Sequence, residues 1–337
     1  MITKNEFISI LEENKNQISP LLMEKADVIR RENYGESVYL RGLIEFTNYC
    51  KNNCYYCGIR AGNKKAKRYR LTREEILSCC AAGNALGFQT FVLQGGEDPW
   101  FSDREICEIV WTIKSRYPTS AVTLSIGEKS RESYQAYHNA GADRYLLRHE
   151  TATEDHYKKL HPENMLLQNR KKCLFTLKEI GFQVGAGCMV GSPGQTLAHL
   201  AEDLCFLQEL QPQMVGIGPF LPHIDTPFGE EKAGSLSLTL TMVALTRILL
   251  PKVLLPSTTA LGTLTPEGRK LGLKCGANVV MPNLSPPEHR KDYTLYNNKL
   301  CTGNEAAEAV QSLCEEIKMT GYLPDFSRGD SKMEKFI

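Results

Sequence analysis

Eight apolar or β-branched runs, separated by segments of helical pattern, constrain the fold of this chain more than any other feature of its sequence. The runs lie at residues 43–47, 90–94, 121–125, 144–147, 184–190, 214–217, 253–257 and 278–281. Strands that alternate with helices predict βαβ units, in which the strands are parallel. Eight such units in about 250 residues predict an α/β fold of the (β/α)8 or TIM barrel type, and a doubly wound open sheet is the alternative.

The segments between these runs carry helix signals. Thr72 is a suitable N-cap for a helix over 73–86, and Glu75 stands at the N3 position of a capping box. Five further amphipathic segments predict helices at residues 103–115, 131–140, 168–181, 196–210 and 239–250. We expect an N-terminal helical extension over 1–40, the barrel over 41–325 and a polar C-terminal tail over 326–337.

Polar and glycine-rich strings follow most of the predicted strands. TNYC, GGEDP, RHET, GSPGQT and GPFLPH come after the first, second, fourth, fifth and sixth runs. In a parallel barrel these strings all lie on the rim at the carboxyl ends of the strands, where TIM-barrel active sites are built. The sequence therefore predicts one composite site on that rim.

Charge and targeting signals argue against several functions. The 337 residues carry a formal net charge of +1, so no overall field favours nucleic acid or an anionic membrane. The first residues, MITKNEFISILEENKNQ, lack the apolar core of a signal peptide, and no run reaches the roughly 18 apolar residues of a membrane span. We expect a cytoplasmic protein whose 12 cysteines are reduced.

The string FTNYCKNNCYYCGIR places Cys50, Cys54 and Cys57 in the loop after the first run. Three thiolates leave one position of a metal centre open, as in a catalytic zinc site or in an iron–sulfur cluster with one iron free of protein ligands. Their clustering in one loop favours iron–sulfur, and no His/Glu set accompanies them to support a zinc hydrolase. Six other cysteines lie in helical patterns and are expected to pack as small apolar residues: Cys79, Cys80, Cys107, Cys173, Cys205 and Cys314.

The C-x3-C-x2-C spacing, with Tyr56 before the last cysteine, resembles the signature of the radical S-adenosylmethionine (radical SAM) enzymes. The resemblance implies a [4Fe–4S] cluster held by Cys50, Cys54 and Cys57, with SAM on the fourth iron. It also implies that an electron from the cluster cleaves SAM to methionine and a 5′-deoxyadenosyl radical. The residues implied to contact SAM are Tyr56, Gln94, Gly95, Gly96, Glu97, Arg148, Glu150, Arg170, Met189 and Ile217.

Longer strings narrow the resemblance. AGADRYLLRHETA, MVGIGPFLPHIDTP and CGANVVMPN resemble the HydE family of FeFe-hydrogenase maturases, relatives of biotin synthase and methylornithine synthase. That resemblance implies assembly of the di-iron subcluster of the hydrogenase H-cluster from a cysteine-bound iron substrate with CO and CN⁻ ligands. It implies the other maturases HydG and HydF as partners, and a reductant such as ferredoxin or flavodoxin. The residues implied for the substrate cavity are Thr123, Arg148, Thr258, Thr259, Met281 and Tyr293.

Several alternatives stay open at this point. The threonines of the implied cavity have a second interpretation, packing within a barrel layer. Some HydE proteins bind a second cluster that begins at a position like Cys301, but here TGNEAAEAVQSL follows, so we expect no second cluster. The alternative function is a methylornithine-synthase- or biotin-synthase-like enzyme for a small amino-acid-type substrate. Biotin synthase needs a second cluster, and Cys188 and Cys275 are expected to be core residues instead. A non-enzymatic metal-binding scaffold would keep the cysteine loop without cleaving SAM.

Overall fold

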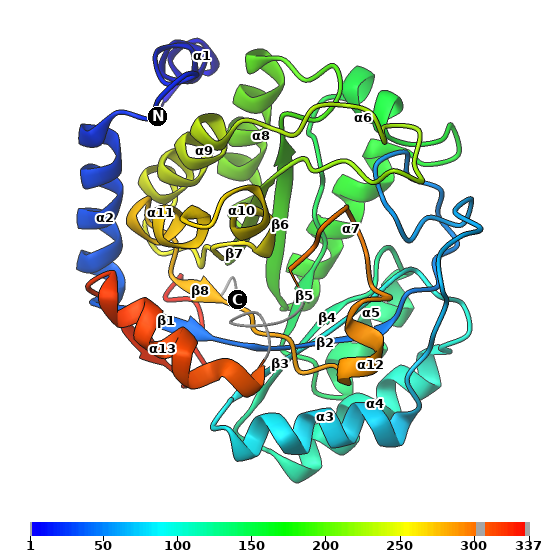
Figure 1. Ribbon diagram of the computed structural model, residues 1–337. Coiled ribbons are helices and arrows are strands. Elements are labelled where there is room, and N and C mark those ends of the chain that lie inside the picture. Colours follow the sequence, from blue (N-terminus) through cyan, green and yellow to red (C-terminus); the bar gives the residue numbers. More distant parts are fainter. Residues whose placement is uncertain (1, 301–306, 334–337) are drawn as a thin grey trace.

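The computed structural model describes residues 2–300 and 307–333 and shows a ring of parallel strands surrounded by helices (Figure 1). The strands are β1 Ser37–Leu40, β2 Gly42–Thr47, β3 Thr90–Gly95, β4 Ala121–Ser125, β5 Arg144–Leu146, β6 Gln183–Val190, β7 Met214–Pro219, β8 Val279–Val280 and β9 Leu323–Asp325. The helices are α1 Lys4–Glu13, α2 Pro20–Tyr34, α3 Arg73–Ala85, α4 Asp103–Arg116, α5 Arg131–Asn139, α6 Glu154–Leu160, α7 Leu167–Ile180, α8 Leu197–Leu210, α9 Leu236–Leu249, α10 Thr259–Leu264, α11 Gly268–Lys274, α12 Pro287–Arg290 and α13 Val310–Met319. No helix in the described part of the chain is both long and apolar enough to span a membrane.

The sheet follows the predicted order. Six parallel strands pair as β2-β3-β4-β5-β6-β7, and a second set pairs as β8-β1-β9. Single parallel bridges connect Met214 with Leu254, Pro256 with Val279, and Leu43 with Asn283. They carry the ring from β7 through residues 254–256 to β8 and back to β2. The predicted α/β barrel architecture is therefore confirmed, with bridges in place of full ladders where the ring closes.

One predicted strand is wrong. The run at 253–257 makes only the bridges at Leu254 and Pro256 and forms no strand. Proline has no N–H to donate, so Pro256 interrupts any ladder that would extend through this segment. The other seven runs coincide with β2 to β8.

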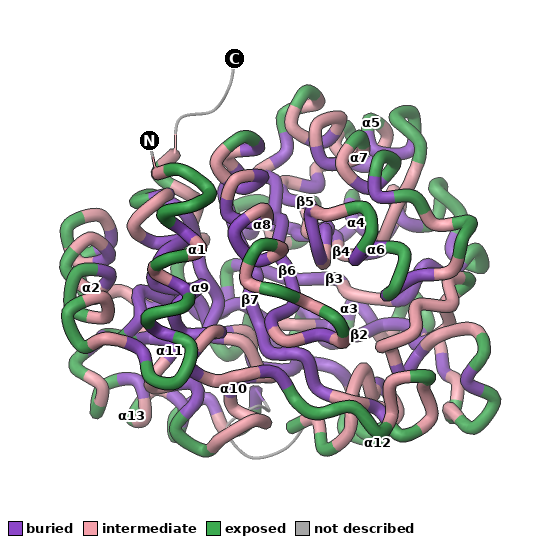
Figure 2. Tube along the Cα trace, turned by 90° about the horizontal axis from the view of Figure 1, so that it is seen from above, coloured by how far each residue is buried: buried purple, intermediate pink, exposed green. Residues whose placement is uncertain are grey.

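The helices cover the outside of the ring, so the buried residues lie along the strands and the exposed residues on the outer helix faces (Figure 2). The predicted capping box of α3 is present: Thr72 Oγ1 accepts a hydrogen bond from the Glu75 N–H at 3.2 Å, and Glu75 Oε2 accepts one from the Thr72 N–H at 2.6 Å. At the N-terminus, α1 packs on α8 and α2 packs on α9. These contacts join the N-terminal helices to the barrel.

Both ends of the chain also contribute to the amino end of the ring. β1 lies within the region expected to be helical and pairs in parallel with β8 and with β9. Beyond β9, Arg328 forms an ion pair with Asp143 at 2.6 Å, and Asp330 forms one with Arg144 at 2.6 Å. Residues 326–333 therefore lie across the amino ends of the strands and close that end of the barrel.

Candidate active site

A cavity of about 280 Å³ opens at the carboxyl ends of the strands. Its volume is near the lower end of the range for small-molecule sites. Most of the residues implied for the site line it: Cys50, Cys54, Tyr56, Cys57, Gln94, Gly95, Gly96, Glu97, Arg148, Glu150, Arg170, Met189, Thr258 and Tyr293. The composite rim that the sequence predicts is thus one continuous cavity.

The cluster loop, residues 48–61, is held in place by backbone contacts to distant segments. The Tyr55 N–H donates to the Leu160 carbonyl at 2.9 Å, and the Gly58 N–H donates to the Leu295 carbonyl at 2.8 Å. The Arg68 guanidinium also donates to the carbonyls of Ile59 and Arg60, at 2.8 and 2.7 Å. A loop without regular structure is thereby fixed along its length, which keeps its three thiols at defined positions.

The three thiols have the surroundings of metal ligands. The Glu97 N–H donates to Cys50 Sγ at 3.4 Å, the kind of N–H···S hydrogen bond that stabilises a metal-bound thiolate. Desolvation raises the pKa of Cys54 to about 12 and the pKa of Cys57 well above its usual value. Without a cation these half-buried thiols stay protonated and inert, whereas a bound metal deprotonates its thiol ligands outright. The donor set therefore fits a metal centre.

The arrangement of the thiols favours a cluster over a single zinc ion. All three come from one loop and line one cavity. In a cubane each protein thiolate binds a different iron, so three cysteines leave the fourth iron free of protein ligands.

The GGE turn after β3 shapes the wall beside Cys50. A Cβ at Gly96 would lie 2.1 Å from the Tyr49 carbonyl oxygen, so only glycine fits there. Glu97, which is 8% exposed, accepts a hydrogen bond from the Glu128 N–H at 3.0 Å and forms an ion pair with Lys51 Nζ at 3.3 Å. The Glu97 carboxylate thus lies between the cavity and Lys51, which is on the outer side of the cluster loop.

Arg148 and Glu150, from the RHET string, have hydrogen-bonding capacity left over. They form an ion pair at 3.1 Å, but Arg148 Nε and Nη2 and Glu150 Oε2 are buried atoms without a hydrogen-bond partner. The ion pair is a charge contact without the geometry of a hydrogen bond, so these atoms can still form hydrogen bonds to a ligand. Buried polar atoms are nearly always satisfied, so partnerless ones on a cavity wall indicate a place for a polar ligand.

The backbone holding this pair is strained and clamped. Glu150 has a φ of 66°, in the left-handed region that non-glycine residues rarely adopt. On one side of it, the Ala152 N–H donates to Asp203 Oδ1 at 2.6 Å. On the other, His149 Nδ1 accepts from the Gly187 N–H at 3.3 Å, while His149 Nε2 lies 3.3 Å from Asp203 Oδ1. The buried His149–Asp203 pair thus fixes the segment that aims Arg148 and Glu150 into the cavity.

Polar contacts of two further side chains, Arg170 and Tyr56, support the cavity wall. Arg170 on α7 forms an ion pair with Glu128 at 2.5 Å and donates to the Arg148 carbonyl at 2.8 Å. The Tyr56 hydroxyl lies 3.2 Å from His161 Nε2. Burial lowers the pKa of His161 to about 3, so His161 is neutral and orients the Tyr56 ring without adding charge.

Four implied residues do not line this cavity. Ile217 is 1% exposed within β7, and its neighbours Gly218, Pro219 and Phe220 line the cavity instead. Thr123 lines a separate void of about 10 Å³ deeper in the barrel, with Arg41 and Arg144. Met281 packs against an apolar group around Tyr39 and Leu254, and Thr259 begins α10 next to the lining residue Thr258. Their roles stay predictions.

Sequence reasoning missed other lining residues, such as Ser125, Gly127, Leu146 and Tyr296. Ser125 ends β4, so the rule that sites form at the carboxyl ends of strands was signal enough to find it. Gly127 has a φ of +80°, and a Cβ there would lie 1.9 Å from Glu97 Cγ. This close approach is between residues that follow two different strands, so no local sequence pattern indicates it.

Comparison with known proteins agrees with this geometry. The radical SAM superfamily model matches residues 44–207. The [FeFe] hydrogenase maturase subunit HydE of Thermotoga maritima is 47% identical over 319 residues, which cover 95% of this chain and 91% of that protein. The chain belongs to the HydE family of radical SAM enzymes. The HydE resemblance of the longer strings is thereby confirmed, and so are the radical SAM chemistry and the iron–sulfur and SAM cofactors that define the superfamily.

More distant relatives of this HydE-family chain share its fold. The 3-methylornithine synthase of Methanosarcina acetivorans is 28% identical, over 88% of this chain and 83% of that protein. The crystal structure of methylornithine synthase (PylB) superposes with a TM-score of 0.85 and 26% identity, over 96% of this chain and 94% of that one. Fold alone therefore does not separate the two activities, and the sequence is more similar to that of HydE, at 47% against 28% identity.

Proposed function

We propose that this chain is a radical SAM maturase that acts in assembly of the di-iron subcluster of FeFe-hydrogenase. One observation carries the proposal: Cys50, Cys54 and Cys57 share a cavity with Arg148 and Glu150, whose buried polar atoms include three that make no hydrogen bond. The chain that builds this cavity is 47% identical to a HydE protein over 95% of its length. The substrate that we propose is a cysteine-bound iron complex with CO and CN⁻ ligands.

Part of the cavity lining is assigned to the two cofactors. We assign the three thiolates to the cluster and Glu97, Arg148 and Glu150 to SAM, because carboxylates and a guanidinium suit its ammonium, carboxylate and ribose groups. With both cofactors bound, the chemistry supplied is one-electron cleavage of SAM to a 5′-deoxyadenosyl radical.

We assign the remaining polar groups to the substrate. Thr258 and Tyr293 line the cavity and would contact the substrate directly. Thr123, Thr259 and Met281 lie outside the lining and would act on the substrate only through the residues that line the cavity. HydG and HydF are the maturases that we propose as partners, and the electron comes from an external reductant.

We further propose a single cluster per chain. Cys301, where a second cluster would begin, lies outside the described residues, so the proposal rests on the string TGNEAAEAVQSL that follows it. Anaerobic reconstitution should yield about four irons per chain, because one cubane holds four. About eight irons would contradict it.

The function is tested by an anaerobic maturation assay. Reconstituted protein with SAM and dithionite should release 5′-deoxyadenosine, and together with HydG, HydF and apo-hydrogenase it should generate hydrogenase activity that is absent when it is omitted. Release of no 5′-deoxyadenosine would favour a metal-binding scaffold instead.

A second candidate, methylornithine synthesis, is favoured by the PylB superposition with a TM-score of 0.85. Incubation with lysine, SAM and dithionite, followed by mass spectrometry, separates the two functions. We expect no methylornithine, and its appearance would replace the maturase assignment.

A further inference from the structure

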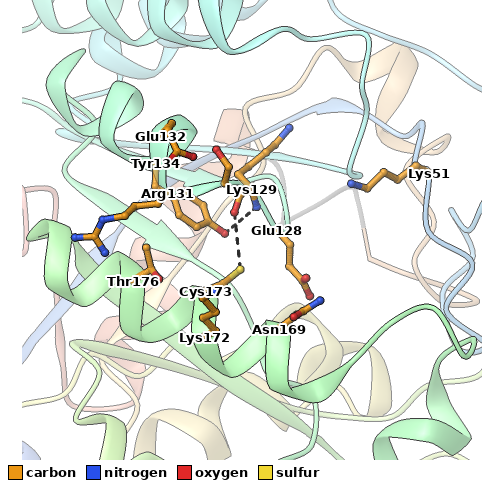
Figure 3. A pocket seen from close by; sticks show the side chains of 11 residues that line it. Lys51, Glu128, Lys129, Arg131, Glu132, Tyr134, Asn169, Lys172, Cys173 and Thr176 are labelled. Carbon is orange, nitrogen blue, oxygen red and sulfur yellow. Dashed lines mark hydrogen bonds between the residues drawn. The ribbon is translucent and has the colours of Figure 1, made fainter.

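A second, larger cleft lies on the outside of the barrel, next to the cluster loop. It has a volume of about 670 Å³ and runs between the start of α5 and the outer face of α7, with Lys51 on its far wall (Figure 3). Figure 3 shows Lys51 reaching toward the cleft from the cluster loop, on the side opposite Arg131. Lys51 directly follows the cluster cysteine Cys50 in the chain.

The wall between this cleft and the active-site cavity is thin. Glu97 lines the cavity, and its carboxylate contacts Lys51 of the cleft at 3.3 Å. Glu128 lines the cleft, and its N–H donates to Glu97 Oε1 at 3.0 Å. The Glu97 N–H in turn donates to Cys50 Sγ at 3.4 Å. A group seated in the cleft is therefore separated from a cluster ligand by little more than one residue.

The cleft is basic, although the chain as a whole is almost neutral. Four of its lining residues are cationic and two are anionic, in a chain with a net charge of +1. One of the anions, Glu128, is neutralised by Arg170 at 2.5 Å, and Arg131 is paired with Glu179 at 2.6 Å. Within the described residues, Lys129 and Lys172 make no ion pair within 4 Å. Lys51 is paired with Glu97 at 3.3 Å, and Glu132 makes no ion pair within the same residues. The cleft therefore keeps two unpaired lysines against one unpaired glutamate, a net positive charge that is available to a partner.

We propose that this cleft is the docking site for a small acidic one-electron carrier protein that reduces the cluster, an inference that rests on the proposed function. Lysines on flexible stems steer and orient a charged partner without the fixed geometry that a small anion needs. The carrier loses one electron and the cluster gains it, and no bond forms or breaks at the interface. The cleft brings this basic surface up to Lys51, the residue that directly follows Cys50.

The test compares two reductants in one double variant, Lys129→Glu/Lys172→Glu. Neither lysine lines the active-site cavity, so dithionite, a small reductant, should drive SAM cleavage in the variant as in the wild type. With reduced flavodoxin as the carrier probe, 5′-deoxyadenosine formation at low salt should fall by about tenfold or more, because charge changes at an interface rim act on the association rate. The Kd for oxidised flavodoxin, measured by calorimetry, should rise by a similar factor.

The matched control is Lys274→Glu. Lys274 is an exposed lysine that lines a smaller cleft beside α2, on the side of the barrel away from α5 and α7 (Figure 1). Its variant should match the wild type in both assays. The docking site is overturned if the double variant binds and uses flavodoxin as the control does, or if it loses dithionite-driven activity as well. Failure of the wild type to cleave SAM with dithionite would instead refute the proposed function, since flavodoxin binding is measured separately.

Discussion

Two arginines on one strand segment show how the two ends of the barrel differ. Arg144, at the amino end, contacts Asp330 at 2.6 Å, the Arg328 carbonyl at 2.7 Å and Thr90 Oγ1 at 3.2 Å. Arg148, at the carboxyl end, has one ion pair and two nitrogens without a hydrogen bond, whereas Arg144 leaves only its Nε without one. The closed end uses its polar groups for stability, and the open end keeps them for a ligand. Mutations at the two ends should therefore fail in different assays.

The largest effect should come from the open end, where Cys54→Ala removes one of three cluster ligands. Two thiolates do not hold a cubane, so iron content and visible absorbance after reconstitution should be lost together with SAM cleavage. Iron analysis and chromatography of 5′-deoxyadenosine measure both.

A matched cysteine shows that the loss is specific to the open end. Cys107→Ala changes a half-buried thiol on α4 that does not line the cavity. Its iron content and 5′-deoxyadenosine yield should equal those of the wild type. Normal cleavage by Cys54→Ala, or loss of the cluster in Cys107→Ala, would contradict the assignment of the cluster ligands.

At the closed end, Arg144→Met should lower the free energy of unfolding by about 3 kcal/mol, because it removes three hydrogen bonds donated by a buried guanidinium at roughly 1 kcal/mol each. The Arg144 side chain is only 4% exposed, whereas Asp330 is 40% exposed and keeps its ion pair with Arg328. Denaturant titration measures the loss. The folded variant should still bind its cluster and cleave SAM, and a selective loss of activity without a loss of stability would mean that this end serves catalysis.

Arg148→Met is the matched change at the open end, and it should have the opposite profile. The Michaelis constant for SAM should rise roughly 10- to 100-fold, because the loss of a hydrogen bond to a charged group weakens binding by about that factor. The free energy of unfolding should change by less than about 1 kcal/mol, because Glu150 is the one ion-pair partner of this side chain among the described residues. A large stability loss with normal SAM kinetics would remove the distinction between the two ends.

Local sequence patterns were sufficient for one end of the barrel and not for the other. The cluster cysteines, the GGE turn and RHET are short strings placed after strands, and parallel topology brings such strings together. The contacts of Arg328 and Asp330 at the amino end span more than 140 residues of chain. A polar terminal string carries no sign of such partners, and its composition is the same for a closing segment as for a solvated tail.

At the open end, short strings do not say which of their residues line the cavity. Successive side chains of a strand point to opposite faces, so neighbouring residues of one string have different surroundings. Ile217 is buried outside the lining for this reason, whereas Gly218 lies within it. The His149–Asp203 clamp was missed for a related reason: His149 lies between two cavity residues, and its partner is on α8.

The smallest effect should be seen in Asp330→Asn, which tests the closed end through pH. Burial alone raises the pKa of Asp330, but Arg144 and the hydrogen bonds from Gln183 and Arg328 outweigh it and hold that pKa well below its usual value. A depressed carboxyl pKa adds stability that is present above the unfolded-state pKa of about 3.9 and is lost as pH falls further.

The variant should therefore be less stable than the wild type at pH 7. Because the Asp330 side chain is 40% exposed, the expected difference is only about 1 kcal/mol. The difference should shrink as pH falls below about 4, where the Asp330 carboxyl group takes up its proton in the unfolded wild-type chain but stays ionised in the folded one. Denaturant titrations of both proteins at several pH values measure it. A difference that stays constant with pH would show that the Asp330 charge does not hold the closed end together.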